Sequence, residues 1–321
     1  MSRLVARAVL LVFVTAAPAA WAQQNYPAHP IRLVVPFSPG GATDILARLL
    51  GQRLTARLGQ PAVVENRAGG GGNIGADLVA KSAPDGYTLL VAGIPQAIGM
   101  SLYHNLSYDL AKDLAPVGQL ATFPSILVVH PSLPVNSVKQ LLALAKARPG
   151  ELNYGANPGS PNHLAIELLN ILGKVRMVLI PYKGAGQVVG DLIAGHIQLA
   201  SMGFPPGLPL VQANRVRAIA VTGATRSPAL PKVPTVIESG IPGYVVTSWY
   251  GVFGPAGLSK DIVTRLNAEL ASMLAAPELK ERLSQLGAEP APLTPEAFGR
   301  HVHEEIGRWA GVVKQSGARA D

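Results

Sequence analysis

One short stretch near the start of the chain, residues 36–44 (PFSPGGATD), constrains the fold most. Residues 31–35 before it have the length and apolar content of a buried strand, and apolar side chains recur at helical spacing from 45 to 58. The stretch is therefore predicted to be a tight turn that leads into a helix N-terminus, which is either an ordinary turn capped by Thr43 or Asp44 or part of a ligand site. The unpaired N–H groups and positive dipole end of such a helix attract anions, and Gly40 and Gly41 let a ligand approach the backbone closely.

The first 22 residues have the pattern of a secretory signal peptide. Arg3 and Arg7 precede an apolar core, and Ala20-Trp21-Ala22 is a small-x-small cleavage site. We predict cleavage after Ala22 and a periplasmic mature protein. The apolar core is shorter than the ~20 residues that a membrane span needs.

Composition excludes several classes of protein. The chain has no cysteine, which rules out disulfides and cysteine-ligated zinc. The formal charge of +8 becomes +6 without Arg3 and Arg7, and the remaining lysines and arginines are scattered, so we expect no nucleic-acid partner. This mild basic bias suits small anionic molecules.

Strand and helix patterns then alternate along the chain. Predicted strands at 62–65 and 87–92 are each followed by a Gly-containing turn, and two further strands are predicted at 117–121 and 125–129. The alternation indicates a parallel, doubly wound sheet, whose ligands bind at the carboxyl ends of the strands. Residues 70–75 match G-x-G-x-x-G, but they follow the second strand and no acidic residue lies ~20 positions on, which argues against a dinucleotide site.

A second α/β cycle occupies residues 137–221. Ser137 is predicted to cap one helix, and Ser160-Pro161 has the sequence of another helix start, which gives a second turn suited to anions. Residues 222–246 are rich in Pro, Gly and Thr, as expected of a crossing between domains. Helices are predicted at about 259–275, 277–286 and 295–316. We therefore predict domain 1 from residues 23–124 and 247–321, and domain 2 from residues 125–246.

Many motifs of this sequence, taken in order along the chain, resemble those of one family, the Bug receptors. These are the substrate-binding proteins of tripartite tricarboxylate transporters. The resemblance covers nearly all of the predicted mature chain. It is carried by residues 26–27, 31–44, 64–69, 72–75, 84–90, 159–161, 163–164, 181–184, 233–236, 240–243 and 248–251.

The resemblance implies a two-lobed, Venus-flytrap periplasmic-binding-protein fold of type II, each lobe a mostly parallel sheet flanked by helices. It also implies a cleft that closes on a small carboxylate, held largely by backbone N–H groups and hydroxyls. The ligand-binding positions that it implies here are Phe37, Ser38, Gly40, Gly41, Thr43, Asp44, Asn66, Ile94, Ala156, Asn157, Gly159, Ser160, His163, Tyr182 and Lys183. The family often has acidic residues near 195–202, where this chain has Gln198 and Met202, so we expect weaker recognition of a ligand amino group.

Several of these residues have a second interpretation. His163 either contacts the ligand or makes a structural hydrogen bond, and Asp44 either contacts ligand or complements the helix dipole. Ser160 is expected to cap a helix rather than act as a nucleophile, since no G-x-S-x-G elbow is present. Lys183 is either an ion-pair partner of the ligand or a solvated surface lysine.

Three functions remain open from the sequence. The first is a receptor that delivers a small carboxylate to a membrane permease of the tripartite tricarboxylate type. The second is a ligand sensor that signals without transport, and the third is a secreted enzyme on the same fold, with Asp44 and His163 as the candidate acid and base. We expect a monomer, with no cofactor and no metal; His301 and His303 are assigned to a solvated helix face.

Overall fold

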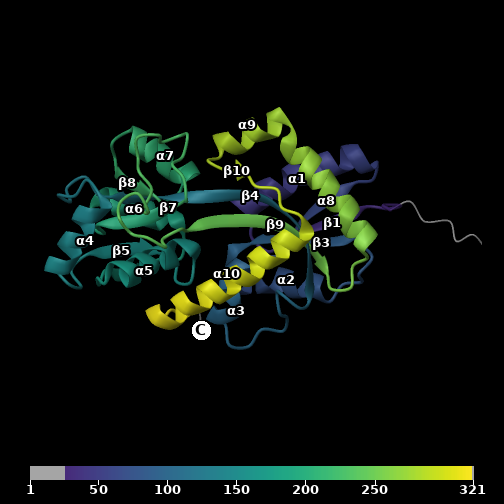
Figure 1. Ribbon diagram of the computed structural model, residues 1–321, viewed down its shortest axis with the longest axis horizontal. Helices are drawn as coiled ribbons and strands as arrows, with labels where there is room; N and C mark the ends of the chain where they lie inside the picture. The colour runs from purple at the N-terminus through teal and green to yellow at the C-terminus, as the bar shows by residue number, and fades with distance from the viewer. Residues whose placement is uncertain (1–25, 320–321) are drawn as a thin grey trace, which may run out of the picture.

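The structure, a computed structural model, describes residues 26–319 as two α/β lobes side by side along the long axis (Figure 1). The predicted signal peptide and its cleavage site lie outside the described residues. The strands are β1 (Ile31–Val35), β2 (Ala62–Asn66), β3 (Thr88–Gly93), β4 (Leu114–Val129), β5 (Asn153–Ala156), β6 (Val178–Pro181), β7 (Leu199–Gly203), β8 (Arg217–Val221), β9 (Thr247–Pro255) and β10 (Glu289–Pro290).

The helices flank these strands. They are α1 (Ala42–Leu58), α2 (Asn73–Ala80), α3 (Ile94–Leu102), α4 (Val138–Ala147), α5 (Pro161–Gly173), α6 (Ala185–Ala194), α7 (Phe204–Gln212), α8 (Lys260–Ala275), α9 (Pro277–Gln285) and α10 (Pro295–Ser316), with a 3-10 turn η1 (Gly70–Gly72) before α2. The three helices predicted at the end of the chain are confirmed as α8, α9 and α10.

The sheet passes continuously from one lobe to the other. Its strand order is β2-β1-β3-β9-β4-β7-β5-β6, with β8 and β10 also paired to β4. Pairs among β1, β2 and β3, and among β5, β6 and β7, are parallel, whereas every pair that includes β4 or β9 is antiparallel. The prediction of two α/β lobes with mostly parallel strands is confirmed.

The prediction of two strands at 117–121 and 125–129 is wrong, because β4 is one continuous strand of 16 residues. Thr122, Phe123 and Pro124 keep their partners on β9, and from Ser125 onward β4 pairs with β7 instead. A proline is tolerated at this change of partner, where a missing N–H interrupts no ladder. We keep the domain segments 23–124, 125–246 and 247–321 as a proposal that places the first boundary at this point.

The register makes the carboxyl ends of the parallel strands in the two lobes face each other. Gly93 at the end of β3 pairs with Tyr250, which pairs in turn with Ala121 of β4. Gly203 at the end of β7 pairs with Ser125, which also belongs to β4. Only four residues of β4, about 13 Å of strand, separate the two edges. Ligands of open α/β sheets bind at such carboxyl edges.

Thr222 joins the two crossings, which are the segments of the chain that pass between the lobes: β4 at Ser125, and the segment that leads into β9 at Val246. Its Oγ1 accepts the Ser125 N–H (2.8 Å) and donates to the Val246 carbonyl (2.6 Å), and its side chain is 0 % exposed. The backbone groups of Thr222 also pair with both residues. One buried threonine therefore holds the start of the second-lobe part of β4 beside the segment that returns to β9.

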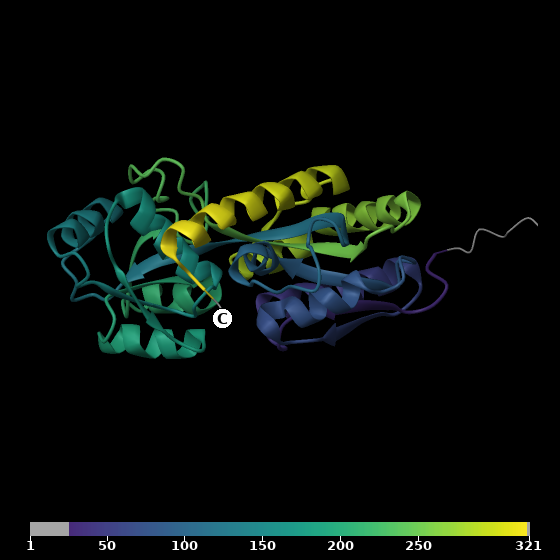
Figure 2. The same cartoon turned by 90° about the horizontal axis from the view of Figure 1, so that it is seen from below.

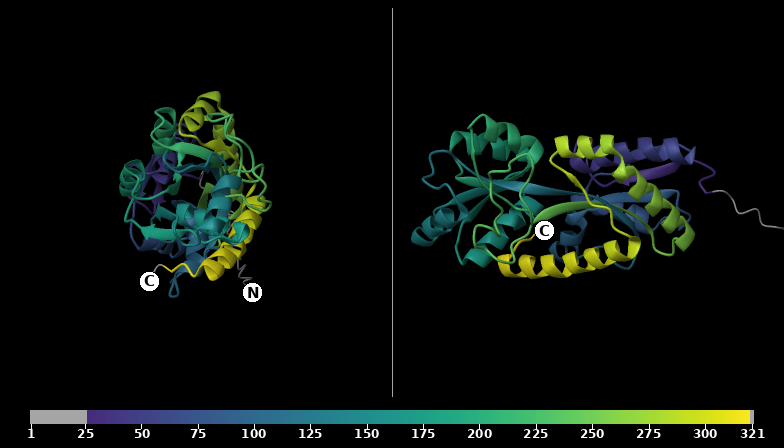
Figure 3. Two further views of the ribbon diagram at one scale, coloured as in Figure 1. Left: turned by 90° about the vertical axis from the view of Figure 1, so that its left-hand side faces the viewer. Right: turned by 45° about the horizontal axis from the view of Figure 1, so that its top comes forward.

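Helix α10 lies along both lobes on one side of the molecule (Figures 2 and 3). It packs against α3 of the first lobe and α5 of the second. The buried Glu305 carboxylate accepts the indole N–H groups of Trp249 (3.1 Å) and Trp309 (2.9 Å), which anchors the helix to the start of β9. Within residues 26–319, no helix combines the length and apolar character needed to cross a membrane.

Helix α7 and helix α3 are absent from the sequence-based prediction. Helix α7 contains Pro209 in its interior and a proline in its first turn, and α3 also has a proline in its first turn. A proline is compatible with the first turn, where its missing N–H has no intrahelical acceptor to lose, but proline-rich sequence obscures the helical pattern.

We predict that Thr222→Val destabilises the protein by about 1–3 kcal/mol, because the buried Ser125 N–H loses its side-chain acceptor at nearly constant volume. Urea unfolding followed by circular dichroism measures the change. The matched control is Thr264→Val, at an exposed position of α8. Equal stability of the two variants would show that Thr222 does not hold the crossings.

Candidate ligand-binding site

The turn between β1 and α1 is held by the Asp44 carboxylate. This residue is 3 % exposed, and its carboxylate accepts hydrogen bonds from the Gly40 N–H (2.9 Å), Asn66 Nδ2 (3.0 Å) and Arg48 Nε (2.9 Å). Burial alone would raise the pKa of the Asp44 carboxyl, but the hydrogen bonds from Arg48, Gly40 and Asn66 outweigh it and hold the pKa below its usual value. Asp44 is therefore an ionised structural group that fixes the shape of the turn.

The expected cap of α1 is wrong. The helix begins at Ala42 with Gly41 as its N-cap, and no side chain caps it, because Asp44 lies inside the first turn and reaches back to Gly40. The first-turn N–H groups of a helix lack intrahelical acceptors. The α1 terminus therefore keeps backbone donors for an anion, although the Gly40 N–H is already used.

The other predicted residues of the first lobe surround this turn. Asn66 Nδ2 also donates to the Phe37 carbonyl (3.0 Å), which ties β2 to the turn. The half-buried Phe37 ring lies against Gly72, where a Cβ would be 3.0 Å from the ring. The buried Thr43 hydroxyl meets the Tyr250 hydroxyl, whose pKa is raised by burial to about 12. Ser38 and Gly41 are exposed, whereas the Ile94 side chain is 0 % exposed and belongs to the core.

In the second lobe, Ser160 caps α5 as predicted. Its Oγ accepts the His163 N–H (3.2 Å), and Pro161 is the first helical residue. The His163 ring then closes the turn, because its Nδ1 accepts the Gly159 N–H (3.0 Å). The ring is 5 % exposed, and burial lowers the pKa of His163 to about 4, so the imidazole is neutral at pH 7. The structural interpretation of His163 is the one that these contacts favour.

Gly159 lies where the two lobes touch. Its φ is +75°, and a Cβ there would come within 2.4 Å of Leu102 Cδ2 on α3. The absence of a side chain at this position therefore permits contact between α3 and the β5–α5 turn. Gly159 is one of the predicted ligand-binding positions, and in this structure its N–H is bonded to His163 Nδ1.

A cavity of about 200 Å³ lies at the carboxyl edge of the second-lobe sheet. Of the predicted residues, Ala156, Asn157 and Ser160 line it; the other nine lining residues are Gly155, Asn162, Ala185, Val188, Val189, Ser201, Met202, Gly203 and Pro206. Helices α5, α6 and α7 begin beside it, after β5, β6 and β7 respectively. None of these twelve described residues is charged. The local field is therefore set by helix N-termini and polar groups, which favours an anion.

Tyr182 and Lys183 lie beside this cavity without lining it. The Tyr182 hydroxyl donates to Asp191 Oδ2 (2.5 Å), and burial together with this bond raises the pKa of Tyr182 to about 12. The Lys183 carbonyl accepts from Asn157 Nδ2 (3.1 Å), and its side chain is exposed. Lys183 therefore supports the Asn157 turn through its main chain.

The site residues that the sequence analysis missed are chiefly Asn162, Ser201 and Pro206. Asn162 follows Ser160, the predicted helix cap, by two residues. This position could have predicted its place in the site, because a side chain in the first turn lies close to the cap. Ser201 belongs to β7, and the cavity reaches it only through the fold. Of the two residues that replace the family's acidic residues near 195–202, Met202 lines the cavity, whereas Gln198 Oε1 accepts the Asn153 N–H (2.8 Å).

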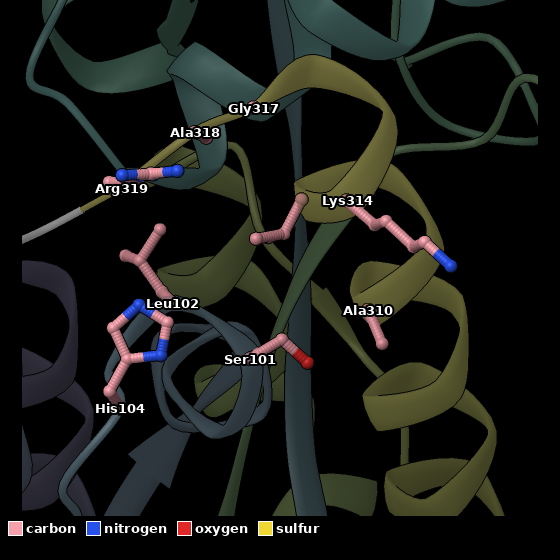
Figure 4. A pocket seen from close by; sticks show the side chains of 9 residues that line it. Ser101, Leu102, His104, Ala310, Lys314, Gly317, Ala318 and Arg319 are labelled. Atoms are coloured by element: carbon pink, nitrogen blue, oxygen red, sulfur yellow. The ribbon is translucent and has the colours of Figure 1, made fainter.

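A second cavity, of about 350 Å³, lies between α3 and the end of α10 (Figure 4). Ser101, His104 and Arg319 are among its lining residues, and the Lys314 amine points away from His104 and Arg319. None of the predicted ligand-binding residues lines it. Among the described residues there is also no cluster of three or more His, Cys, Asp or Glu side chains that would hold a metal ion.

The fold and the cavity define a two-lobed solute-binding protein. The sequence matches the family model "Tripartite tricarboxylate transporter family receptor" over residues 46–318, so the chain belongs to this family of receptors. It is 39 % identical to Protein BugT of Bordetella pertussis over 99 % of each chain. It is also 38 % identical to the UPF0065 protein in the tcbD-tcbE intergenic region of Pseudomonas sp. strain P51, over 97 % of this chain and 93 % of the other.

Solved structures agree with this assignment. The structure described as R. palustris Rpa4515 with adipate is 41 % identical, with a TM-score of 0.80 over 92 % of this chain and 99 % of the other. MatC of Rhodopseudomonas palustris with bound malate is 33 % identical, with a TM-score of 0.75 over 90 % and 100 %. The periplasmic binding protein BugD is 33 % identical, with a TM-score of 0.77 over 92 % and 100 %. The predicted Bug-receptor resemblance and periplasmic-binding-protein fold are confirmed.

We predict that protonation of His163 destabilises the protein below neutral pH. The folded-state pKa of about 4 lies below the ordinary value of 6.5, so the unfolded chain binds more protons between these pH values and stability falls as pH falls through the window. This group alone accounts for a loss of about 2 kcal/mol between pH 7.5 and pH 5. Urea unfolding at both pH values measures it.

The control for this prediction is His163→Asn, whose Oδ1 can replace Nδ1 as the acceptor of the Gly159 N–H without titrating. The variant should lose less stability than the wild type over the same pH interval. Identical losses in the two proteins would contradict a buried, neutral His163.

Proposed function

We propose that this protein is a periplasmic receptor that captures a small carboxylate between its lobes and delivers it to a membrane permease of the tripartite tricarboxylate type. The observation that carries the proposal is the placement of an uncharged cavity, bordered by helix N-termini, at a carboxyl edge that faces the α1 terminus of the other lobe. Relatives at 41 % and 33 % identity have been solved with adipate and with malate.

Backbone donors carry the recognition in this proposal. The α1 terminus offers first-turn N–H groups from one lobe, and α5 and α6 offer theirs from the other. Asp44 and His163 stiffen the two turns by taking the Gly40 and Gly159 N–H groups. Pre-formed turns reduce the ordering cost of binding, which improves affinity. The predicted positions Phe37, Ser38, Gly41 and Ser160 remain our proposed ligand contacts.

Closure of the lobes is the proposed conformational step. The cavity in the second lobe has about 200 Å³, less than the ~300–1,000 Å³ of complete ligand sites. The first-lobe turn would supply the missing wall, with Phe37 as a cover. A ligand that contacts both turns binds the closed form better and so shifts the equilibrium toward it.

The family is one of receptors rather than enzymes. The two candidate catalytic groups fit this assignment, because Asp44 is ion-paired to Arg48 in one lobe and the His163 Nδ1 is bonded within its own turn in the other. We propose that the chain acts as a monomer, exported by its signal peptide, and that it meets a permease rather than a regulator.

The proposal is tested by a thermal-shift screen of the purified protein against mono-, di- and tricarboxylates, amino acids and aromatic acids. A ligand at ~1,000 times its dissociation constant adds about 4 kcal/mol of stability, and we expect a carboxylate to do so and to be recovered unchanged. A hit that is chemically altered would favour an enzyme. A panel without any stabilising carboxylate would overturn the proposal.

Transport and sensing are separated by deletion of the gene. Loss of uptake of the stabilising carboxylate, measured with labelled compound, is the result we expect. Normal uptake with lost induction of transport genes would instead indicate the sensor.

A further inference from the structure

Asn162 is a polar residue of the second-lobe cavity whose side chain is held by two serine hydroxyls. It is the second residue of α5, is half-buried and lines the cavity. Its Oδ1 accepts the hydroxyl of Ser125 (3.2 Å) and that of Ser201 (3.4 Å). An amide oxygen has two lone pairs, and both are satisfied here by hydroxyl donors. With its oxygen bonded to these two hydroxyls, the side chain has its amide nitrogen available as a donor to a ligand in the cavity.

The two serines fix this orientation from the sheet beneath. Ser125 is the first residue of β4 that pairs with β7, and Ser201 lies in β7 itself, so both hydroxyls come from adjacent strands of the second lobe. Ser125 is also held at its backbone N–H by Thr222. A donor supported by buried groups of rigid strands is pre-organised, which makes it selective for an acceptor at one position.

Part of the cavity wall is apolar, beside the polar residues Asn157, Ser160 and Ser201. Val188, Val189, Met202 and Pro206 line it, and none of its described lining residues is acidic. A carbon chain fits such a wall, whereas an ammonium group would be desolvated there with no carboxylate to compensate it. The cavity thus combines an apolar side with a neutral amide donor.

We propose that Asn162 is a specificity-determining residue, whose amide N–H group binds an oxygen of a second carboxylate at the end of an apolar chain and disfavours an ammonium group in that place. The inference rests on the proposed function, because the first carboxylate of the ligand is assigned to the α1 terminus. It also assigns a ligand-binding role to a residue outside the sequence-predicted site. The ligand class is a dicarboxylate with an apolar middle.

The test uses pairs of probes of equal chain length. Each α,ω-dicarboxylate from succinate to adipate is compared with the ω-amino acid in which an ammonium replaces one carboxylate. Calorimetric titration gives the dissociation constants of the wild type, Asn162→Asp, Asn162→Ala and Asn136→Asp. The last variant makes the same charge change at an exposed residue before α4 and is the matched control.

The wild type and Asn136→Asp should bind a dicarboxylate and discriminate against its ω-amino partner. Asn162→Asp keeps an acceptor for both serines but faces the cavity with a negative oxygen, so dicarboxylate affinity should fall at least tenfold and the preference should move toward the ω-amino acid. Asn162→Ala, which adds no charge, should lose about tenfold for the dicarboxylate. A purely structural role of Asn162 would not change the preference between the two probes.

The outcomes separate the inference from the function beneath it. Dicarboxylate affinity within threefold of the wild type in both Asn162 variants would overturn the role of Asn162 and leave the receptor intact. If Asn162→Asp does not fold, as judged by its unfolding transition without ligand, Asn162→Ala decides alone. If no carboxylate stabilises or binds the wild type, the receptor function fails, and the role of Asn162 fails with it.

Discussion

The continuity of β4 through both lobes is the constraint on which the rest of the structure depends. One strand of 16 residues pairs with β9 in the first lobe and with β7 and β8 in the second. Its pairing register brings the ends of β3 and β7 to within four residues of each other along the strand. The position of the candidate site is therefore set by main-chain hydrogen bonds, before any side chain contributes to ligand recognition.

The ionisable side chains of the two turns at that site bond to groups of the protein itself. Asp44 is paired with Arg48 and receives the Gly40 N–H, and the neutral His163 ring receives the Gly159 N–H. Both side chains are buried, and they hold the backbone of the two turns in place. In the proposed function, these turns offer pre-oriented N–H groups, which can bind an anion without the desolvation cost of a buried cation.

A few buried contacts hold the lobes and the segments between them in place. Thr222 ties the two crossings together, Glu305 anchors α10 near β9, and Leu102 meets Gly159 across the lobes. Phe204 of α7 similarly lies against Gly287, where a Cβ would be 2.3 Å away. Close packing at these positions resists continuous deformation, so the closure that we propose would need a discrete change at the crossings.

The sequence by itself determined the α/β class, the helix starts at Ser137 and Ser160, the last three helices and the family, because these depend on local periodicity, capping chemistry and ordered motifs. Only the tertiary structure decided that β4 is unbroken, since Thr122–Pro124 resemble a turn until β9 pairs with them. It likewise showed that Asp44 and His163 bond to their own turns and that Ser125 and Ser201 orient Asn162. Those partners are far apart in sequence or depend on burial, and no local pattern encodes a contact that forms only when strands pair.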